Sequence, residues 1–374
     1  MDKIILFIYL VLFPFGQLLR ASIFNASDIV AGLAFIYMLF KKRGTSKVFS
    51  PLKDFLFIAS FSLLLSVFNF KSLDLAVGVL YLTRVVLYFY FFKYVLSLIK
   101  ENIKLREVIL NSLIAVSFAT ALFGWLQYFI YPDLTSLRYL GWDDHLFRLV
   151  GTFLDPGFTS LIIVFGGILS MFSFIKTNKK KFLLLALFFI LSLAFTYARA
   201  GYVAFALSLF AIGMITKRMR LGISLFIILL GIIYFLPRPL GEGVNLARMY
   251  SVSLRVENYK DTLDIFKESP VFGVGFNNIC LAKKVYLGRG DLESHSCSGS
   301  DSSLLLILAT TGIVGLMVFA GSIIRIIKLL PKSYYSNVFL VLLVAVFTHS
   351  LFVNSLFYPW IMGYLAISAS LVEE

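Results

Sequence analysis

Long apolar runs alternate with short polar connections along most of this chain. A helix needs about 20 mostly apolar residues to cross a membrane, and the apolar runs predict twelve spans. The predicted spans are residues 3–20, 28–40, 54–70, 75–99, 108–131, 157–176, 182–198, 200–216, 221–237, 303–325, 335–353 and 356–372. The pattern therefore predicts an all-α polytopic membrane protein, with a single membrane domain over residues 1–374 and one large polar loop at 237–303.

The composition agrees with this fold class. The chain is 60% hydrophobic and 14% charged, and its mean hydropathy is +0.91. So little polar surface cannot cover a soluble globule, which excludes that class. The first apolar run lacks a small-residue cleavage site, so we expect no cleavable signal peptide.

Basic residues divide unequally between the two ends of the predicted spans. Nineteen Lys and Arg lie at one end, whereas the alternate short connections hold five. Positively charged loops stay in the cytoplasm, so we expect both termini there and the 237–303 loop outside. The formal charge of +14 is scattered over many short loops and forms no single groove or stripe. We therefore expect no nucleic-acid partner.

The outward face is richer in arginine than the inward face. It carries eight Arg and five Lys, against five Arg and fourteen Lys inside. A guanidinium group binds phosphate oxygens in bidentate fashion and stays charged. This bias predicts an anionic ligand at the outer face. The alternative is that the arginines anchor the span ends at lipid headgroups.

The segment Arg148-Leu-Val-Gly-Thr-Phe-Leu-Asp-Pro-Gly157 precedes the sixth predicted span. Asp155 can cap a helix whose first turn tolerates Pro156. An anion can bind at the positive end of such a helix. The ordinary start of a helix is the alternative interpretation.

The segment Thr196-Tyr-Ala-Arg-Ala-Gly-Tyr202 turns the chain between two apolar spans at the outer interface. Arg199 is the single charge in this tight turn. It is therefore either a headgroup anchor or a contact to a ligand.

Apolar residues in the large loop recur at helical spacing. They are Val256, Tyr259, Leu263 and Phe266, with polar residues between them. This spacing predicts an amphipathic helix over residues 254–268, on the membrane surface or against the bundle. We expect Ser253 to cap it and Ser269-Pro270 to end it. Such a helix would hold Arg255 at the depth of lipid phosphates.

Taken in order, these patterns resemble the O-antigen polymerase and O-antigen ligase family of bacterial membrane glycosyltransferases. The resemblance covers about 170 residues and rests on the order, spacing and membrane side of its elements. The elements are Arg148-x-x-Gly-Thr-Phe-x-x-Pro156, Thr196-x-x-Arg-x-Gly201, Arg255 with Tyr259, Ser269-Pro-Val-Phe-Gly-Val-Gly275 and Gly312-Ile-Val-Gly315.

The resemblance implies a C-type glycosyltransferase fold that acts on an oligosaccharide linked through diphosphate to a polyprenyl lipid. The reaction would take place at the outer leaflet of the bacterial cytoplasmic membrane. A hydroxyl of an acceptor glycan would displace the lipid diphosphate with inversion, without a metal ion or another cofactor. Arg199 and Arg255 match the family's diphosphate-binding arginines, and Arg148 and Tyr259 are candidate substrate-binding residues. Membrane lipids and a chain-length regulator protein are further candidate partners.

One departure from the family pattern bears on the two branches of the family. Ligases carry a His followed by Asn, Ser or Gln ten residues before the first Gly of Gly-x-x-Gly, but the residue at this place is Ser302. This favours a polymerase over a ligase that transfers glycan to lipid A core. His295 and Asp301 are candidates to orient or deprotonate the acceptor hydroxyl. A solvated loop His and a helix-capping Asp are the alternatives.

Two further features leave alternatives open. Arg84 lies inside the fourth span, where an uncompensated charge costs about 2.5–3.5 kcal/mol, so it either contributes to a donor cavity or pairs with another side chain. Cys280 and Cys297 both lie in the outward loop and can form a disulfide in an oxidising compartment, although the sequence does not set their distance. The scattered His residues and the spacing of the two Cys do not match a zinc site.

A transporter or flippase for a lipid-linked or anionic solute is the alternative from another class of protein. Transporters tend to hold their binding residues near the membrane midplane, on broken helices of repeated halves. No convincing internal repeat is found in this sequence, and its polar residues gather on one face. This arrangement favours chemistry on a lipid headgroup.

Overall fold

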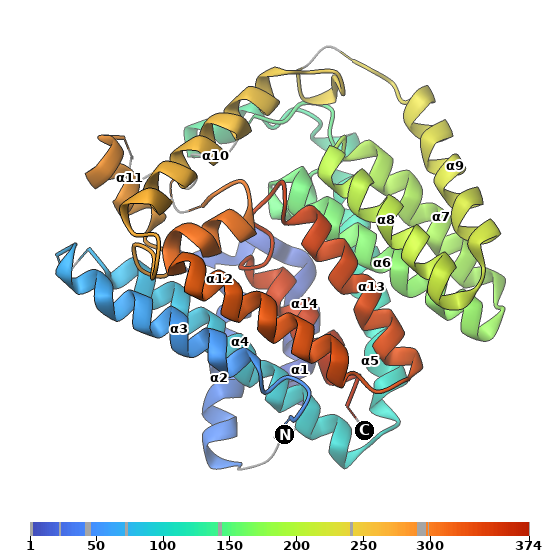
Figure 1. The fold of residues 1–374 in the computed structure, drawn as a ribbon. Coiled ribbons are helices and arrows are strands. Elements are labelled where there is room, and N and C mark those ends of the chain that lie inside the picture. The colour runs from blue at the N-terminus through green and yellow to red at the C-terminus, as the bar shows by residue number, and fades with distance from the viewer. Residues whose placement is uncertain are drawn as a thin grey trace.

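The computed structural model describes residues 3–21, 24–41, 46–71, 74–140, 144–239, 242–289, 297 and 299–373. This part of the chain is a bundle of helices (Figure 1). The α-helices are α1 (Ile4–Leu12), α2 (Ala26–Phe40), α3 (Leu52–Leu65), α4 (Ala76–Glu101), α5 (Leu105–Ile130), α6 (Pro156–Thr177), α7 (Lys180–Phe195), α8 (Arg199–Thr216), α9 (Met219–Phe235), α10 (Tyr250–Glu268), α11 (Ile279–Leu287), α12 (Ser303–Leu329), α13 (Tyr334–His349) and α14 (Pro359–Ser370). The shorter elements are the 3-10 helices η1 (Phe13–Leu19), η2 (Ser66–Phe68), η3 (Thr135–Leu140), η4 (Gly151–Phe153) and η5 (Glu242–Val244), and the antiparallel strands β1 (Arg20–Ala21) and β2 (Phe24–Asn25).

The helices support a polytopic membrane protein. Among the described residues, five helices are long and apolar enough to cross a membrane, namely α4, α5, α6, α8 and α12. Shorter apolar helices cover residues 4–19, 26–40, 219–235 and 334–349. Each predicted span overlaps at least one helix of the bundle, but the total of twelve spans stays a prediction.

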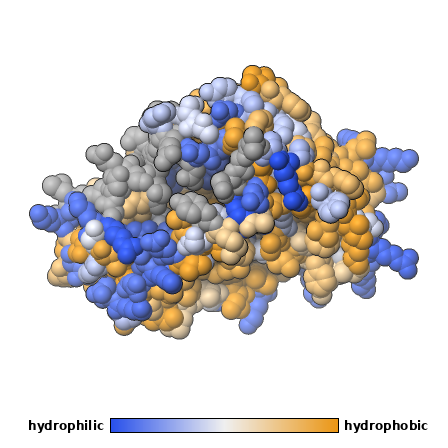
Figure 2. Space-filling model, turned by 90° about the horizontal axis from the view of Figure 1, so that it is seen from above, coloured by the Kyte–Doolittle hydropathy of each residue, from blue (hydrophilic) through white to orange (hydrophobic). Residues whose placement is uncertain are grey.

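The two chain ends lie at the end of the bundle opposite α10 (Figure 1). Seen from the α10 side, hydrophilic residues lie near the middle of the face and at its left and right ends, and hydrophobic residues lie along its upper right and lower side (Figure 2). That the termini and the large loop lie on opposite sides of a membrane stays a prediction. Which of the two sides is cytoplasmic stays a prediction.

Helix α6 lies at the centre of the bundle and is buried along most of its length. It packs against α5, α7, α8 and α13. Its start confirms the predicted cap, because the Asp155 carboxylate accepts hydrogen bonds from the backbone N–H groups of Gly157 at 2.6 Å and Phe158 at 3.0 Å. A buried, capped helix holds the preceding loop, with Arg148, in a fixed place.

Helix α12 is broken at Gly312, where φ is +68° and ψ is −175°. The segment 269–275 fits against this break. The N–H groups of Val274 and Gly275 donate to the carbonyls of Ala309 and Thr310, at 3.1 Å each. After the break, the N–H of Ile313 donates to the Pro270 carbonyl at 2.9 Å.

These hydrogen bonds explain why irregular backbone is tolerated beside an apolar helix. Away from water, each backbone polar group must find a partner within the protein, and the break and the inserted segment supply partners to each other. The segment also fixes the end of the large loop, because α10 ends just before it at Glu268.

Helix α10 is the amphipathic helix that the loop pattern predicted, but its predicted start was wrong. It begins at Tyr250 after Met249, so Ser253 lies inside the helix and does not cap it. The additional turn is held by a tertiary contact, since the Ser251 hydroxyl accepts a hydrogen bond from Arg199 at 2.8 Å. The predicted end before Ser269 is confirmed.

Candidate functional site

Arg199 is the first residue of α8 and joins that helix to the large loop. Its guanidinium donates to the carbonyls of Leu246 and Arg248, at 3.3 Å each, and to the Ser251 hydroxyl at 2.8 Å. These contacts place the start of α10 beside the outer end of α8. Part of the guanidinium is therefore committed to holding the loop.

Arg148 is buried and supports the turn that carries Arg199. Its guanidinium donates to the carbonyls of Thr196 at 3.0 Å and Tyr197 at 3.3 Å. Tyr197 has a φ of +50°, which is strained for a residue with a side chain. Burial, and then the positive charge of Arg248, lower the pKa of Arg148 to about 10. Arg148 thus keeps the turn in place and adds positive charge beneath it.

Arg255 lies one turn into α10 and brings a third guanidinium to this place. Its positive charge helps to lower the pKa of Arg148 and of Arg199. The same charge also influences His349 at the end of α13. Within the described part of the chain, Arg255 makes no hydrogen bond or ion pair that satisfies its own charge. Asp155 is the one carboxylate that acts on Arg148 among the described residues, so the three guanidinium groups keep an excess of positive charge, which favours an anionic ligand.

Tyr259 follows Arg255 one turn later on α10. Its hydroxyl donates to the Leu351 carbonyl at 2.7 Å, which ties α10 to the segment between α13 and α14. Burial raises the pKa of Tyr259, the charge of Arg255 opposes this shift, and that of Asp301 adds to it. Tyr259 therefore stands between the arginine cluster and Asp301.

Asp301 precedes α12, and Ser302 caps that helix by accepting from the Leu305 N–H at 3.4 Å. The Asp301 N–H donates to the side-chain oxygen of Asn258 at 2.9 Å, and the Ser300 hydroxyl donates to the same oxygen at 3.3 Å. Asn258 was missed in the sequence, although it lies on α10 three residues after Arg255. The candidate His295 lies outside the described residues.

Cys280 and Cys297 form a disulfide, with 4.9 Å between their Cα atoms. The bond joins α11 to the segment that leads to Asp301. Disulfides of this kind are typical of oxidising compartments, and the side of the membrane on which this loop lies stays a prediction.

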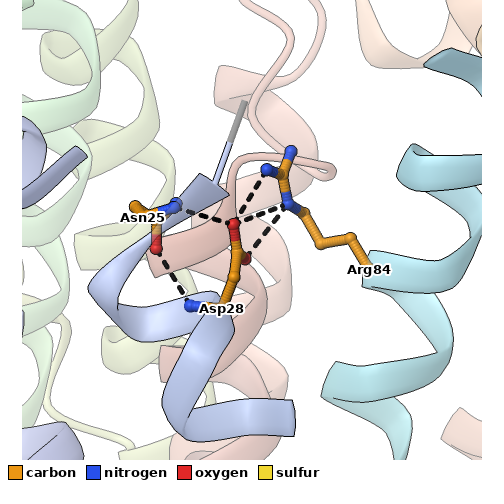
Figure 3. Close-up of polar contacts among 3 residues, drawn as sticks. All are labelled: Asn25, Asp28 and Arg84. Carbon is orange, nitrogen blue, oxygen red and sulfur yellow. Dashed lines mark hydrogen bonds and ion pairs between the residues drawn. The ribbon is translucent and has the colours of Figure 1, made fainter. Parts of the chain in front are cut away.

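Arg84 pairs with Asp28 of α2 in a buried ion pair (Figure 3). Its NH2 group lies 2.8 Å from an Asp28 oxygen, and its Nε donates to both carboxylate oxygens. The same carboxylate accepts from the N–H of Asn25 and so completes a capping box at the start of α2. This is the side-chain pairing that the sequence left as one of two alternatives, and a role in substrate binding stays a prediction.

Replacing Arg84 by alanine should lower the free energy of unfolding by about 3–5 kcal/mol, because Asp28 would stay buried without a counterion. Thermal unfolding of the purified protein in detergent measures this loss. The double variant Arg84→Met, Asp28→Asn keeps an acceptor for the α2 cap and should recover most of the stability. A single variant that melts like the wild type would contradict the structural role, and a stable but inactive double variant would support a role in the site.

An apolar cleft of about 190 Å³ lies beneath this region. Helices α3 and α12 form one wall, and α4, α13 and α14 form the other. Among its lining residues are Phe55, Phe319, Phe92, Leu343, Leu356 and Phe357. The lining residues are buried or half-buried.

The outer end of the cleft adjoins the polar site. Leu356 lines the cleft, and its N–H donates to the Ser303 hydroxyl at 3.1 Å. Ser355, just before Leu356, is hydrogen-bonded to His349 at 2.6 Å. The positive charge of Arg255 is close enough to influence His349. The apolar cleft and the polar site therefore meet at the segment between α13 and α14.

No cluster of three or more His, Cys, Asp or Glu side chains suited to a metal ion is found in the part of the chain that the structure describes. The fold and the site thus define a helical membrane protein with a cluster of arginines at one end of the bundle and an apolar cleft near it. A family model described as O-antigen ligase matches residues 183–320. The match runs from α7 into α12 and includes Arg199, Arg255 and Asp301.

This match supports membership of the O-antigen ligase and polymerase family, whose members are glycan-transferring membrane enzymes. No curated protein matches the chain.

Proposed function

We propose that this protein is a glycosyltransferase that polymerises an oligosaccharide linked through diphosphate to a polyprenyl lipid, at the outer leaflet of the bacterial cytoplasmic membrane. The observation that carries the proposal is the uncommitted guanidinium of Arg255 beside Arg148 and Arg199. A diphosphate is the anion that suits such a cluster, because several guanidinium forks can share its oxygens.

In the proposed reaction, an acceptor hydroxyl oxygen attacks the anomeric carbon of the donor sugar. The bond from that carbon to the diphosphate oxygen breaks with inversion, and its electron pair leaves with the polyprenyl diphosphate. The hydroxyl proton passes to a base, for which Asp301 and His295 are the candidates. The arginines stabilise the charge that develops on the leaving diphosphate, which is electrostatic catalysis by groups fixed in advance. No step requires a metal ion.

The apolar cleft supports a substrate that carries a hydrocarbon chain. The outer end of the cleft lies at Leu356. The preceding residue, Ser355, is hydrogen-bonded to His349. An isoprenoid tail in the cleft would place a diphosphate near Arg255. The polar residues and the cleft meet at one face of the bundle, which favours transfer at a headgroup over transport across the membrane.

A ligase is the second candidate function, because the matching family model is described as O-antigen ligase. Ser302, at the place where ligases of the resembled family carry His, favours the polymerase. A chain-length regulator protein remains a candidate partner for either activity.

The purified protein in lipid nanodiscs, supplied with polyprenyl-diphosphate-linked repeat units and lipid A core, tests the proposal. We expect long glycan on the polyprenyl carrier, seen as a ladder by gel electrophoresis. Glycan on the lipid A core instead would identify a ligase. Neither product, together with movement of the lipid-linked glycan between leaflets, would favour the transporter.

A further inference from the structure

Two asparagine side chains, Asn258 on α10 and Asn354 between α13 and α14, contact the same short segment of the chain. The Asn258 side-chain oxygen accepts hydrogen bonds from the Asp301 N–H at 2.9 Å and from the Ser300 hydroxyl at 3.3 Å. The Asn354 side-chain oxygen accepts from the Ser303 hydroxyl at 3.1 Å. Both amide oxygens are therefore committed to the segment that leads into α12.

These contacts fix how each amide is turned. A backbone N–H can bond only to the oxygen of a side-chain amide, so the Asn258 NH2 group is turned away from that N–H. The Asn354 nitrogen lies 3.6 Å from the place that a Cβ on Gly299 would take. Within the described part of the chain, neither NH2 group has a hydrogen-bond partner. Both side chains are half-buried, so a ligand at the surface can reach these donors.

Asn258 lies on the side of α10 that faces the bundle, one turn after Arg255. Arg255 and Asn258 are half-buried and Thr262 is buried, whereas Glu257 is exposed. Residues three or four positions apart share one side of a helix, and one turn rises about 5.4 Å. Arg255 and Asn258 are therefore neighbours along one side of α10.

The connection between α13 and α14 borders this place from the bundle. Its Leu351 carbonyl accepts from the Tyr259 hydroxyl at 2.7 Å, next to Asn258 on α10. Its Asn354 holds the start of α12. The two amides thus border one polar region beside Arg255, one from α10 and the other from the bundle.

We propose that Asn258 and Asn354 form a subsite for the sugar that is joined directly to the lipid diphosphate. The inference rests on the proposed function, because it takes Arg255 as a contact of the diphosphate. A diphosphate at Arg255 would place the attached sugar about one helical turn along α10, beside the two amides. An amide NH2 group donates hydrogen bonds and cannot accept them, so the subsite suits hydroxyl and acyl oxygens of a sugar.

The neighbouring cleft separates the sugar from the hydrocarbon chain of the same substrate. Leu356 lines the apolar cleft, and Asn354 lies two residues before it. An amide without a hydrogen-bond partner is costly against a hydrocarbon chain, whereas a sugar offers several oxygens to it. The connection between α13 and α14 would therefore meet the chain at Leu356 and the sugar at Asn354.

The substitution Asn258→Asp tests the subsite. It removes the amide donors and keeps an oxygen for the Asp301 N–H, so it should melt like the wild type. Asn354→Asp is the equivalent test from the bundle, and it carries the test if Asn258→Asp melts early. Asn245→Asp is the matched control, because the Asn245 oxygen also accepts from a backbone N–H in the large loop, that of Ala247 at 3.0 Å. All three variants add the same negative charge.

The affinities of the purified protein in detergent for two soluble probes are measured by calorimetry. One probe is inorganic diphosphate, and the other is the oligosaccharide diphosphate left after the lipid is removed from the lipid-linked repeat unit. The wild type should prefer the second probe. We expect Asn258→Asp and Asn354→Asp each to reduce this preference by about three- to tenfold, the effect of a lost neutral hydrogen bond. Asn245→Asp should keep it. The preference is a ratio of two affinities, so repulsion of both diphosphates by an added charge largely cancels.

The outcomes separate the subsite from the proposed function. Equal binding of the two probes by the wild type would overturn the subsite, and so would a preference in either test variant that equals that of Asn245→Asp. A reduced preference in both test variants, without chain growth by the wild type, would contradict the proposed function and leave the subsite standing. Binding of neither probe by the wild type would overturn both.

Discussion

Arg255→Ala is expected to slow chain growth by about ten- to a hundredfold or more. One charged hydrogen bond to the leaving group contributes roughly 1.5–3 kcal/mol, and each 1.36 kcal/mol changes the rate about tenfold. Arg255 should show this effect most directly. Arg148 and Arg199 also hold the backbone of the turn and the loop, so their variants would mix structural damage with lost catalysis.

Arg289→Ala is the matched control for this measurement. Arg289 belongs to the same outward loop but is exposed and pairs with Glu257 at 3.1 Å, so its loss should leave the rate nearly unchanged. Arg255→Lys keeps the charge without the fork and should retain part of the activity. Rates are measured with lipid-linked repeat units in nanodiscs, at matched protein concentration. Chain growth by Arg255→Ala at the rate of Arg289→Ala would remove Arg255 from the mechanism.

The membrane architecture could be predicted because it depends on local properties of the chain. Apolar runs correspond to helices, and the distribution of basic residues predicted that Arg148, Arg199 and Arg255 share one side. The sequence could not show that Arg148 and Arg199 donate to backbone carbonyls. Those contacts join residues about 50 positions apart, and only the packed fold brings such segments together.

The same limit explains Arg84. Its partner Asp28 lies 56 residues away on another helix, and a buried pair of this kind has no signature in the local pattern. The helix cap at Asp155 could be predicted, in contrast, because its partners Gly157 and Phe158 follow it by only two and three positions.

The largest effect on stability is expected at Gly312. At a φ of +68°, a side chain is strained whatever the space around it. A Cβ at this position would also clash with the Val271 carbonyl oxygen, and the inserted segment would have to move. We expect Gly312→Ala to lower the free energy of unfolding by at least about 3 kcal/mol.

Gly321→Ala on the same helix is the control. It measures how a Gly→Ala substitution changes the stability of α12 away from the break at Gly312. A Cβ at Gly321 meets no atom within 4 Å, and alanine favours a regular helix over glycine by about 1 kcal/mol. Gly321→Ala should therefore melt at or above the wild-type temperature, and Gly312→Ala well below it. Because the segment at the break follows α10 directly, Gly312→Ala should also disturb Arg255 and lose chain growth at temperatures where it is still folded. Equal melting of the two variants would mean that α12 continues unbroken through Gly312, and the large loop would then need another anchor.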